Sequence, residues 1–216
     1  MGLGIGAIQH TKNTAALIAD ALRSAIMQGK LRSGQALRQD EIAAEFKVSK
    51  IPVREALVQL QAEGLVDLIP SRGAIVSHLS IDEIVEIYTM RRALEPIALE
   101  RAIPNATEAD FLKAGRILDQ IDFVDDLMHW AELNWDFHAA LYAPAGMPLL
   151  EQTVQTLHNN GVRYLILNYL DRAYLEVSQN QHRELLALCR QREITLACEK
   201  LRLHLLDPME EIRKRE

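Results

Sequence analysis

Three histidines of this chain lie at positions where helices would bring their rings together. His138 follows Asn134 by four residues, so both lie on one face of a helix. His182 and His204 lie further along, each in a helical segment whose apolar neighbours turn it toward the inside of a bundle. Three imidazoles and one amide oxygen suit zinc, nickel or another borderline divalent ion, with positions left open for water or a ligand. The sequence therefore predicts a divalent metal site, with zinc as the first choice.

The alternative is that these histidines are unrelated residues that only hold a bundle together. Asp136 faces away from Asn134 on the same helix and is the poorer candidate ligand. His129 and His158 have no comparable placement, so we expect them to be surface or core residues. His10 belongs to a patternless N-terminal arm.

Arg91 is a second candidate, because it falls in a largely apolar helical stripe with Tyr88 one turn before it. A buried guanidinium needs an anionic partner. Glu95, one turn later, can supply that charge within the helix. Alternatively, Arg91 and Tyr88 can bind the carboxylate of a small organic acid. Both interpretations remain open at this point.

Long helices must position these residues, because apolar side chains recur at three- and four-residue spacing from residue 81 onward. Breaks fall at residues 104–105 and 144–148, which contain proline, and at two shorter turns. We predict helices over residues 81–101, 108–121, 125–142, 149–169, 174–190 and 193–206. No strand pattern interrupts them, so residues 79–216 are predicted to form an antiparallel helical bundle.

The front of the chain has a different pattern, centred on residues 48–66. Ser49 precedes an amphipathic helix and can cap it by accepting a backbone N–H bond. The inward side of this helix carries Val53, Leu57, Leu60 and Gly64, and its outward side near the N-terminus carries Lys50, Ile51 and Arg54. A recognition helix enters the major groove in this way, with its N-terminal side chains at the base edges.

Neighbouring segments complete a DNA-binding unit. Helices are predicted over residues 14–28 and 39–46, and the second is joined by a tight turn to the recognition helix, as in a helix-turn-helix. Two β-rich runs, residues 65–69 and 74–76, flank a turn and predict a hairpin wing. The expected DNA-contacting residues are Arg38, Ser49, Lys50, Ile51, Arg54, Arg72 and Gly73, with Arg38 near phosphate and Arg72 and Gly73 in the wing.

These motifs resemble a known family. The resemblance is carried by residues 16–18, 29–31, 34–38, 41–43, 48–57, 63–66 and 71–74. Their order is similar to the winged helix of GntR-family bacterial transcription regulators, and the helical remainder resembles the FCD effector domain of the FadR-type branch. The resemblance implies an Asp or Asn four residues before a first His, with two more His on the last two helices. That pattern is matched here by Asn134, His138, His182 and His204.

The chain departs from the family where Arg and Thr are usual, because Lys50 and Ile51 stand there. Lysine still donates to guanine or phosphate, but it lacks the bidentate fork of arginine. The operator preference of relatives therefore does not transfer directly.

The charge of the chain argues at first against a nucleic-acid partner, since 24 Lys/Arg and 30 Asp/Glu give 216 residues a formal net charge of −6. Residues 1–78, however, hold nine of the basic and seven of the acidic residues, so the acidic excess lies elsewhere. Cys189 and Cys198 lack metal-type spacing and are expected to be reduced thiols. No apolar run can span a bilayer, so we expect a cytoplasmic protein without a membrane partner.

We therefore expect a mainly α protein in three parts: a flexible arm over residues 1–13, a winged helix-turn-helix of three helices and a β-hairpin over 14–78, and an FCD-like helical domain for ligand, metal and dimerisation over 79–216. The expected function is a homodimeric transcription regulator, a repressor, that binds double-stranded operator DNA and responds to a small carboxylate metabolite at the metal site. The rival interpretations are a regulator with a metal-free structural C-terminal domain and a metal-dependent hydrolase. No carboxylate is placed as a general base, so we do not expect an enzyme.

Overall fold

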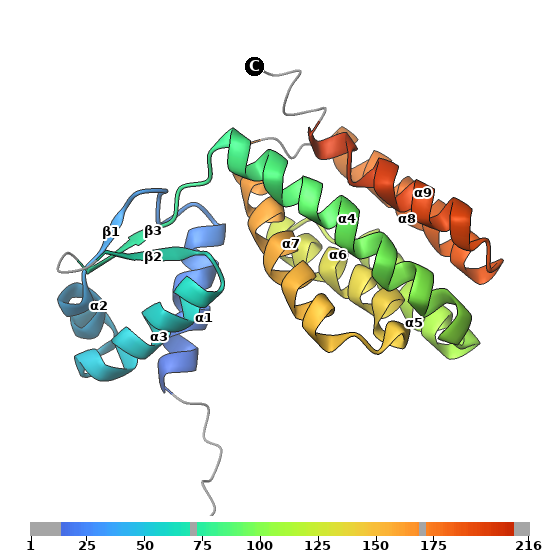
Figure 1. Cartoon of the computed structure of the whole chain (residues 1–216). Helices are drawn as coiled ribbons and strands as arrows, with labels where there is room; N and C mark the ends of the chain where they lie inside the picture. Colours follow the sequence, from blue (N-terminus) through green and yellow to red (C-terminus); the bar gives the residue numbers. More distant parts are fainter. Residues whose placement is uncertain (1–13, 70–72, 169–171, 210–216) are drawn as a thin grey trace, which may run out of the picture. The chain divides into compact units, whose positions relative to one another are not determined.

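The computed structural model describes residues 14–69, 73–168 and 172–209 and divides into two compact units between His78 and Leu79 (Figure 1). The first unit holds α1 (Thr14–Met27), β1 (Ala36–Leu37), α2 (Gln39–Phe46), α3 (Lys50–Ala62), β2 (Val66–Ile69) and β3 (Gly73–Val76). The second holds α4 (Ile81–Asn105), α5 (Glu108–Ile121), α6 (Leu127–Tyr142), the 3-10 turn η1 (Ala143–Ala145), α7 (Pro148–Asn168), α8 (Arg172–Arg190) and α9 (Ile194–His204). The predicted arm over residues 1–13 lies outside the described residues.

The first unit is a helix-turn-helix packed on α1. Val53, Leu57 and Leu60 of α3 are fully buried, as their spacing predicts. Gly64, which we expected on the same helical face, instead follows the end of α3 with a φ of 73°. This left-handed conformation ends the helix, because a residue with a Cβ rarely adopts it.

A three-stranded antiparallel sheet in the order β1-β3-β2 completes the first unit. The pair of β2 and β3 is the predicted hairpin, with Val66 opposite Val76 and Ile69 opposite Gly73. Strand β1 lies between the first two helices, where we predicted no strand; it pairs only Ala36 and Leu37 with β3. Two residues are too few to show an alternating pattern, which explains the omission.

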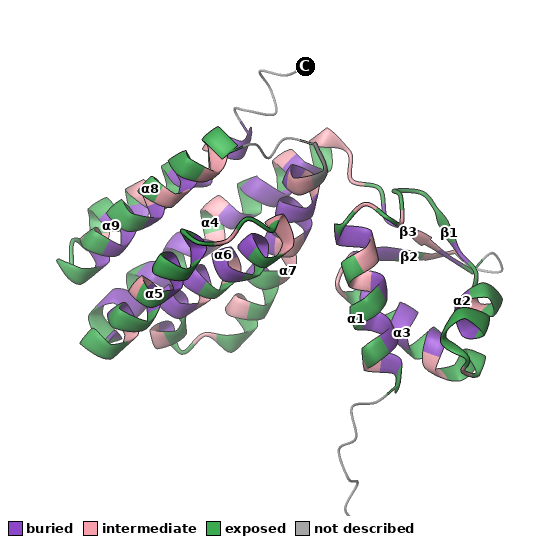
Figure 2. Cartoon of the chain, turned by 180° about the vertical axis from the view of Figure 1, so that it is seen from behind, coloured by how far each residue is buried: buried purple, intermediate pink, exposed green. Residues whose placement is uncertain are grey.

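The second unit is an antiparallel helical bundle, as predicted. Helix α4 packs against α6, α7 and α9, while α5 packs against α6 and α8 (Figure 1). Buried residues line the sides of these helices that face one another (Figure 2). Helix α4 runs four residues beyond its predicted end, and one of its apolar residues, Ile97, is 49% exposed.

The starts of several helices are fixed by side chains. Ser80 caps α4 in a reciprocal capping box with Glu83, and Asp126 caps α6 by accepting the N–H of His129. Asp126 therefore fixes the residue at which α6 begins. Ser49 does stand at the N-cap of α3, but its side chain accepts no cap hydrogen bond, so that part of our prediction is wrong.

Candidate functional site

The three predicted histidine ligands converge inside the helical unit. His138 on α6, His182 on α8 and His204 on α9 are buried, and one ring nitrogen from each lies within 4.8 Å of the other two. The Nε2 atoms of His182 and His204 are 3.2 Å apart. Two nitrogens bound tetrahedrally at about 2.0–2.1 Å from one zinc ion are separated by roughly 3.3 Å. The donor set and its spacing therefore fit a shared divalent ion.

Asn134 lies beside this cluster, buried one turn before His138 on α6. Its Nδ2 atom is 3.5 Å from Nε2 of His182. A half-turn of the amide exchanges nitrogen and oxygen and would direct the Oδ1 atom, the one able to bind a metal, to that position. Asp136 is exposed, as the helical geometry predicts.

The orientation of His138 is set from outside the cluster. Its Nδ1 is 3.0 Å from the hydroxyl of Tyr142, and that hydroxyl donates to Oε2 of Glu95 at 2.6 Å. Because the Tyr142 proton is committed to the carboxylate, the tyrosine oxygen accepts and Nδ1 of His138 must donate. The lone pair of His138 therefore lies on Nε2. In metal sites, a partner on the second ring nitrogen orients the ligand in this way.

Arg91 is buried and pairs with Glu95, its Nε donating to Oε1 at 2.6 Å. Its NH2 group lies 3.2 Å from Nδ1 of His158, which must accept because a guanidinium has only donors. Burial by itself lowers the pKa of Arg91, but the negative charge of Glu95, followed by the interaction with Tyr88, outweighs this effect and the pKa is raised. Arg91 therefore stays charged, and the helix itself supplies the partner that the first interpretation requires.

His158, which we expected to be a surface or core residue, is a core residue, and it lies next to the histidine cluster. It is buried on α7, contacts Arg91, and its ring centre lies 6.1 Å from that of His138. Sequence analysis also missed Tyr142, which contacts His138 and donates to Glu95. It missed Gln181 as well, whose Oε1 is 2.7 Å from Nδ1 of His204. Tyr142 stands four residues after His138, so that helical spacing was the one available signal.

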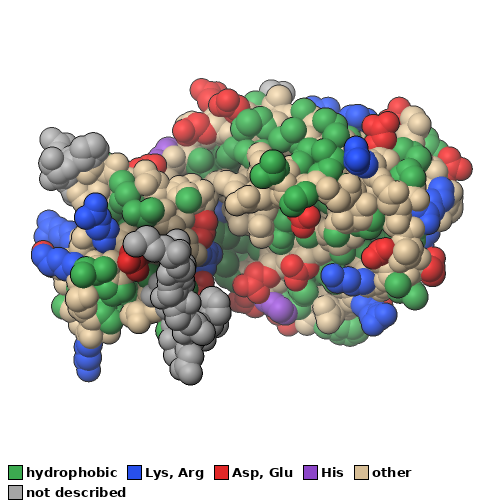
Figure 3. Space-filling model, turned by 60° about the horizontal axis from the view of Figure 1, so that its bottom comes forward, with side chains coloured by type: hydrophobic (Ala, Val, Ile, Leu, Met, Phe, Trp, Pro, Cys, Tyr) green, Lys and Arg blue, Asp and Glu red, His purple; other side chains and the backbone are tan. Residues whose placement is uncertain are grey.

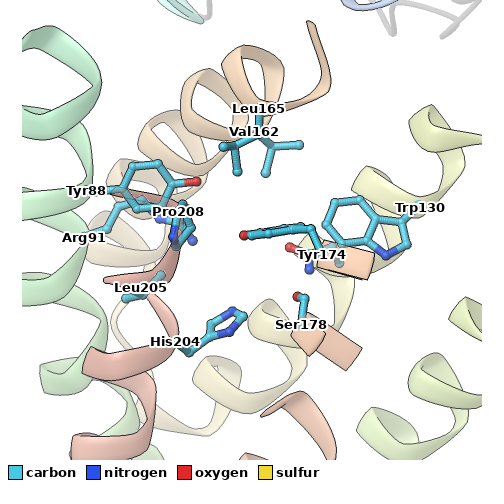
Figure 4. Close-up of a pocket in the computed structure, with 11 residues that line it drawn as sticks. Tyr88, Arg91, Trp130, Val162, Leu165, Tyr174, Ser178, His204, Leu205 and Pro208 are labelled. Atoms are coloured by element: carbon cyan, nitrogen blue, oxygen red, sulfur yellow. The ribbon is translucent and has the colours of Figure 1, made fainter. Parts of the chain in front are cut away.

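A small cavity adjoins the histidines. Its walls include the basic groups Arg91 and His204, the polar residues Asn134 and Ser178, and a larger aromatic and apolar part (Figure 4). The remaining lining residues are Tyr88, Trp130, Val162, Leu165, Tyr174, Leu205 and Pro208. Few polar groups in a mostly apolar wall are typical of a site for a small molecule with one polar end.

The ring charges of the cluster are set by burial. Desolvation, followed by the charges of neighbouring rings and Arg91, lowers the pKa of His138 well below its usual value. Desolvation and then His204 act in the same direction on His182, and desolvation and then Arg91 lower the pKa of His204 to about 3. The rings are therefore neutral at physiological pH, which is the form that binds a metal.

The residues expected at DNA lie on the first unit, and Figure 3 shows Lys and Arg side chains gathered at one side of it. Lys50 and Ile51 open α3, and Ile51 is 71% exposed. Arg54 is exposed one turn later. Lys50 contacts Asp40 of α2, and Arg38, at the N-cap of α2, pairs with Glu41 at 3.3 Å.

Gly73 begins β3 and is exposed, with a φ of 92°. A residue with a Cβ would be strained there, so glycine suits the end of the hairpin turn. Arg72, the other expected wing contact, lies outside the described residues.

Comparison with known proteins gives two family matches. Residues 14–76 match the model of bacterial regulatory proteins of the gntR family, and residues 86–207 match the FCD domain. The chain belongs to the GntR family, in its FCD-containing branch. The resemblance seen in the sequence is thereby confirmed.

Relatives of this GntR protein are transcription regulators. It is 29% identical over 199 residues to the HTH-type transcriptional repressor GlaR of Escherichia coli, covering 87% of this chain and 90% of GlaR. A GntR-family regulator structure from Pseudomonas syringae has 33% identity and a TM-score of 0.55, covering 94% of this chain and 87% of that one. A GntR structure from Rhodococcus has 22% identity and a TM-score of 0.79, covering 94% and 98%, and supports the fold.

This GntR protein is a DNA-binding transcription regulator with an FCD domain, and its family and relatives are regulators and not enzymes. The hydrolase interpretation is thereby removed. Among the described residues, no helix combines the length and the apolar character that a bilayer span requires.

Proposed function

We propose that this regulator is a homodimeric repressor whose affinity for operator DNA is controlled by a small carboxylate. The carboxylate binds in the FCD domain together with a divalent metal ion, for which zinc is the first choice. The observation that carries the proposal is the convergence of His138, His182 and His204 beside a cavity that also contains Arg91. Repressor action is supported by one relative, the transcriptional repressor GlaR.

The metal ligands proposed are Asn134, His138, His182 and His204. One amide and three imidazoles fill the four positions of tetrahedral zinc, so an exogenous oxygen would bind by raising the coordination number to five, which zinc allows. When bound, the ion supplies positive charge that a carboxylate can share. Nitrogen-rich sites of this kind favour zinc, nickel and similar ions over magnesium or calcium, which prefer oxygen ligands.

The effector is proposed to be a small organic acid held by Arg91 and Tyr88 on the other side of the cavity. Arg91 already pairs with Glu95 and contacts His158, so an incoming carboxylate shares a guanidinium whose position is fixed in advance. Burial raises the pKa of Tyr88 to about 12, so its hydroxyl remains protonated and able to donate. The apolar wall suits the carbon skeleton of such an acid.

At the DNA end, we propose that Lys50, Ile51 and Arg54 reach base edges and that Arg38, Ser49, Arg72 and Gly73 approach the backbone or the minor groove. A homodimer places one α3 in each half-site. An effector changes operator affinity only through its different affinities for two arrangements of that dimer. The proposal therefore requires both sites in the same molecule.

The metal part is tested by elemental analysis of protein purified without an affinity metal. We expect about one zinc or similar ion per chain, and its loss in His182→Ala, because two imidazoles and an amide bind far more weakly than three imidazoles and an amide. His129→Ala, which changes an exposed histidine of the same unit, is the matched control.

Operator binding completes the test. Adding small carboxylic acids to the metal-loaded chain should weaken its binding to operator DNA, and His182→Ala should bind operator without that response. If the unchanged chain contains no metal and does not bind added zinc, the metal part of the proposal is wrong. If carboxylic acids weaken operator binding equally in the unchanged chain and in His182→Ala, the histidine cluster does not take part in the response to the effector.

A further inference from the structure

We propose that Gln181 and Asp207 act as a clamp that fixes His204 as an Nε2 metal ligand and holds the segment 205–209 against the effector cavity. The inference rests on the proposed metal site, but neither residue belongs to it. Gln181 lies on α8, one residue before His182, and Asp207 follows the end of α9.

The hydrogen bonds fix the direction of every donor in this chain of contacts. Nε2 of Gln181 contacts a carboxylate oxygen of Asp207, and an ionised carboxylate only accepts. The amide nitrogen of Gln181 must therefore face Asp207, and its oxygen faces Nδ1 of His204 at 2.7 Å. Because an amide oxygen also only accepts, Nδ1 of His204 must carry the proton. The lone pair of His204 is then committed to Nε2, beside Nε2 of His182.

The other two rings show why this clamp matters. His138 has an equivalent partner, the hydroxyl of Tyr142, so its tautomer is also set from outside. Nδ1 of His182, by contrast, is buried without a hydrogen-bond partner among the described residues. Without a metal, His182 donates its Nε2 proton to His204, and binding an ion requires that proton to move to Nδ1. Two rings are thus fixed in advance, and one adjusts.

The same clamp reaches the cavity. Leu205, two residues before Asp207, and Pro208, directly after it, line the cavity together with His204 (Figure 4). Met209 packs with Ile84 and Tyr88 of α4. Asp207 therefore lies in a short segment that forms one cavity wall, and its contact with Gln181 connects that wall to the metal-ligating face of α8.

The first test measures binding of zinc alone by calorimetry. Gln181→Met preserves the length of the side chain and removes both hydrogen bonds, so we expect zinc affinity about 10–100-fold weaker than that of the unchanged chain. Gln155→Met, an exposed position on α7, is the matched control and should bind zinc normally. Thermal melting without zinc should be similar for the variants, which separates positioning from a loss of folding.

A rescue variant keeps the test independent of any damage by a single change. In Gln181→Glu combined with Asp207→Asn, the new carboxylate can accept both the Nδ1 proton of His204 and the new amide proton. We expect this double variant to bind zinc within about threefold of the unchanged chain, since a carboxylate is a common outer partner of metal-bound histidine. Equal affinity of Gln181→Met and the unchanged chain, or no recovery in the double variant, would overturn the clamp alone.

Hydrogen exchange gives a second readout that does not depend on regulation. Zinc should slow exchange of the backbone amides of Leu205, Leu206, Asp207 and Met209 in the unchanged chain and leave it unaltered in Gln181→Met. Identical protection in both would overturn the proposed hold on this segment. Failure of the unchanged chain to bind zinc at all would overturn the clamp together with the metal part of the proposed function, so the two failures are distinguishable.

Discussion

At the scale of single residues, Gly161 shows how the cavity is shaped. A Cβ at this position on α7 would lie 3.3 Å from the ring of Tyr88, whereas a Cβ at Gly115 on α5 would meet nothing closer than 3.5 Å. Both glycines lie inside helices, where alanine is favoured by about 1 kcal/mol. We expect Gly115→Ala to raise the free energy of unfolding by up to that amount. Gly161→Ala should gain less or nothing and should alter binding of carboxylates, because the Tyr88 ring must shift.

Chemical denaturation and effector titration of the two variants check this prediction together. Equal stabilisation by both alanines, with unchanged acid binding, would show that the contact between Gly161 and Tyr88 does not shape the cavity.

The convergence of the candidate residues could be predicted where helical spacing and residue type were both informative. The ligand candidates Asn134 and His138 share a helix face, and the interior sides of α8 and α9 direct His182 and His204 inward. His158 was missed because its neighbours along the chain do not reveal that Arg91 of a distant helix contacts it. Residues that hydrogen-bond to a candidate ligand from another helix, such as Gln181, are identified only by side-chain geometry between helices. The spacing of residues within one helix does not reveal them.

At the scale of elements, α3 offers a direct test of DNA reading. Arg54 is exposed on the polar side of α3 and makes no side-chain hydrogen bond or ion pair among the described residues. Arg54→Ala should weaken binding to operator by about 1–3 kcal/mol and leave folding and zinc content unchanged. Arg116→Ala, an exposed arginine on α5, is the control. Fluorescence anisotropy with operator and unrelated DNA, each over a salt series, measures both effects; unchanged operator affinity would remove Arg54 from the contacts.

Element boundaries were predictable where a strong local signal coincided with packing. Residues 39–46 and 108–121 were predicted as helices with the ends that the structure has. The end of α4 was placed too early, because Pro104 was expected to stop a helix that in fact continues through it to Asn105. Ser49 illustrates the limit of a capping rule: the residue occupies the N-cap, yet its side chain makes no cap bond. Residue type identifies the position, whereas rotamer and surroundings decide the hydrogen bond.

At the scale of the whole molecule, the two units differ in charge and in what they bury. The acidic excess of the chain lies beyond residue 78. The DNA-binding unit therefore carries no net negative charge that would repel the phosphates of DNA. The helical unit instead buries His138, His158, His182 and His204 in one interior. Burial of several neutral histidines makes the stability of this unit depend on pH in a direction that can be derived.

Desolvation lowers the pKa of all four rings. As the pH falls through about 6.5, these imidazoles therefore become protonated in the unfolded chain while they stay neutral in the folded chain. The stabilisation is therefore fully present above about pH 6.5, and it is lost as pH falls toward the folded values, about 3 for His204. Each ring contributes a slope of up to about 1.4 kcal/mol per pH unit in that window.

Fluorescence during denaturation reports this unit alone, because both tryptophans, Trp130 and Trp135, lie on α6. We expect the free energy of unfolding of the metal-free chain to fall steeply below pH 6.5 and less steeply in His158→Gln, while His129→Gln keeps the full slope. A slope that His158→Gln leaves unchanged would show that this ring is not held neutral by burial. Since the rings need not release protons to bind zinc at pH 7, the calorimetric enthalpy of zinc binding should also be nearly independent of the buffer's ionisation enthalpy.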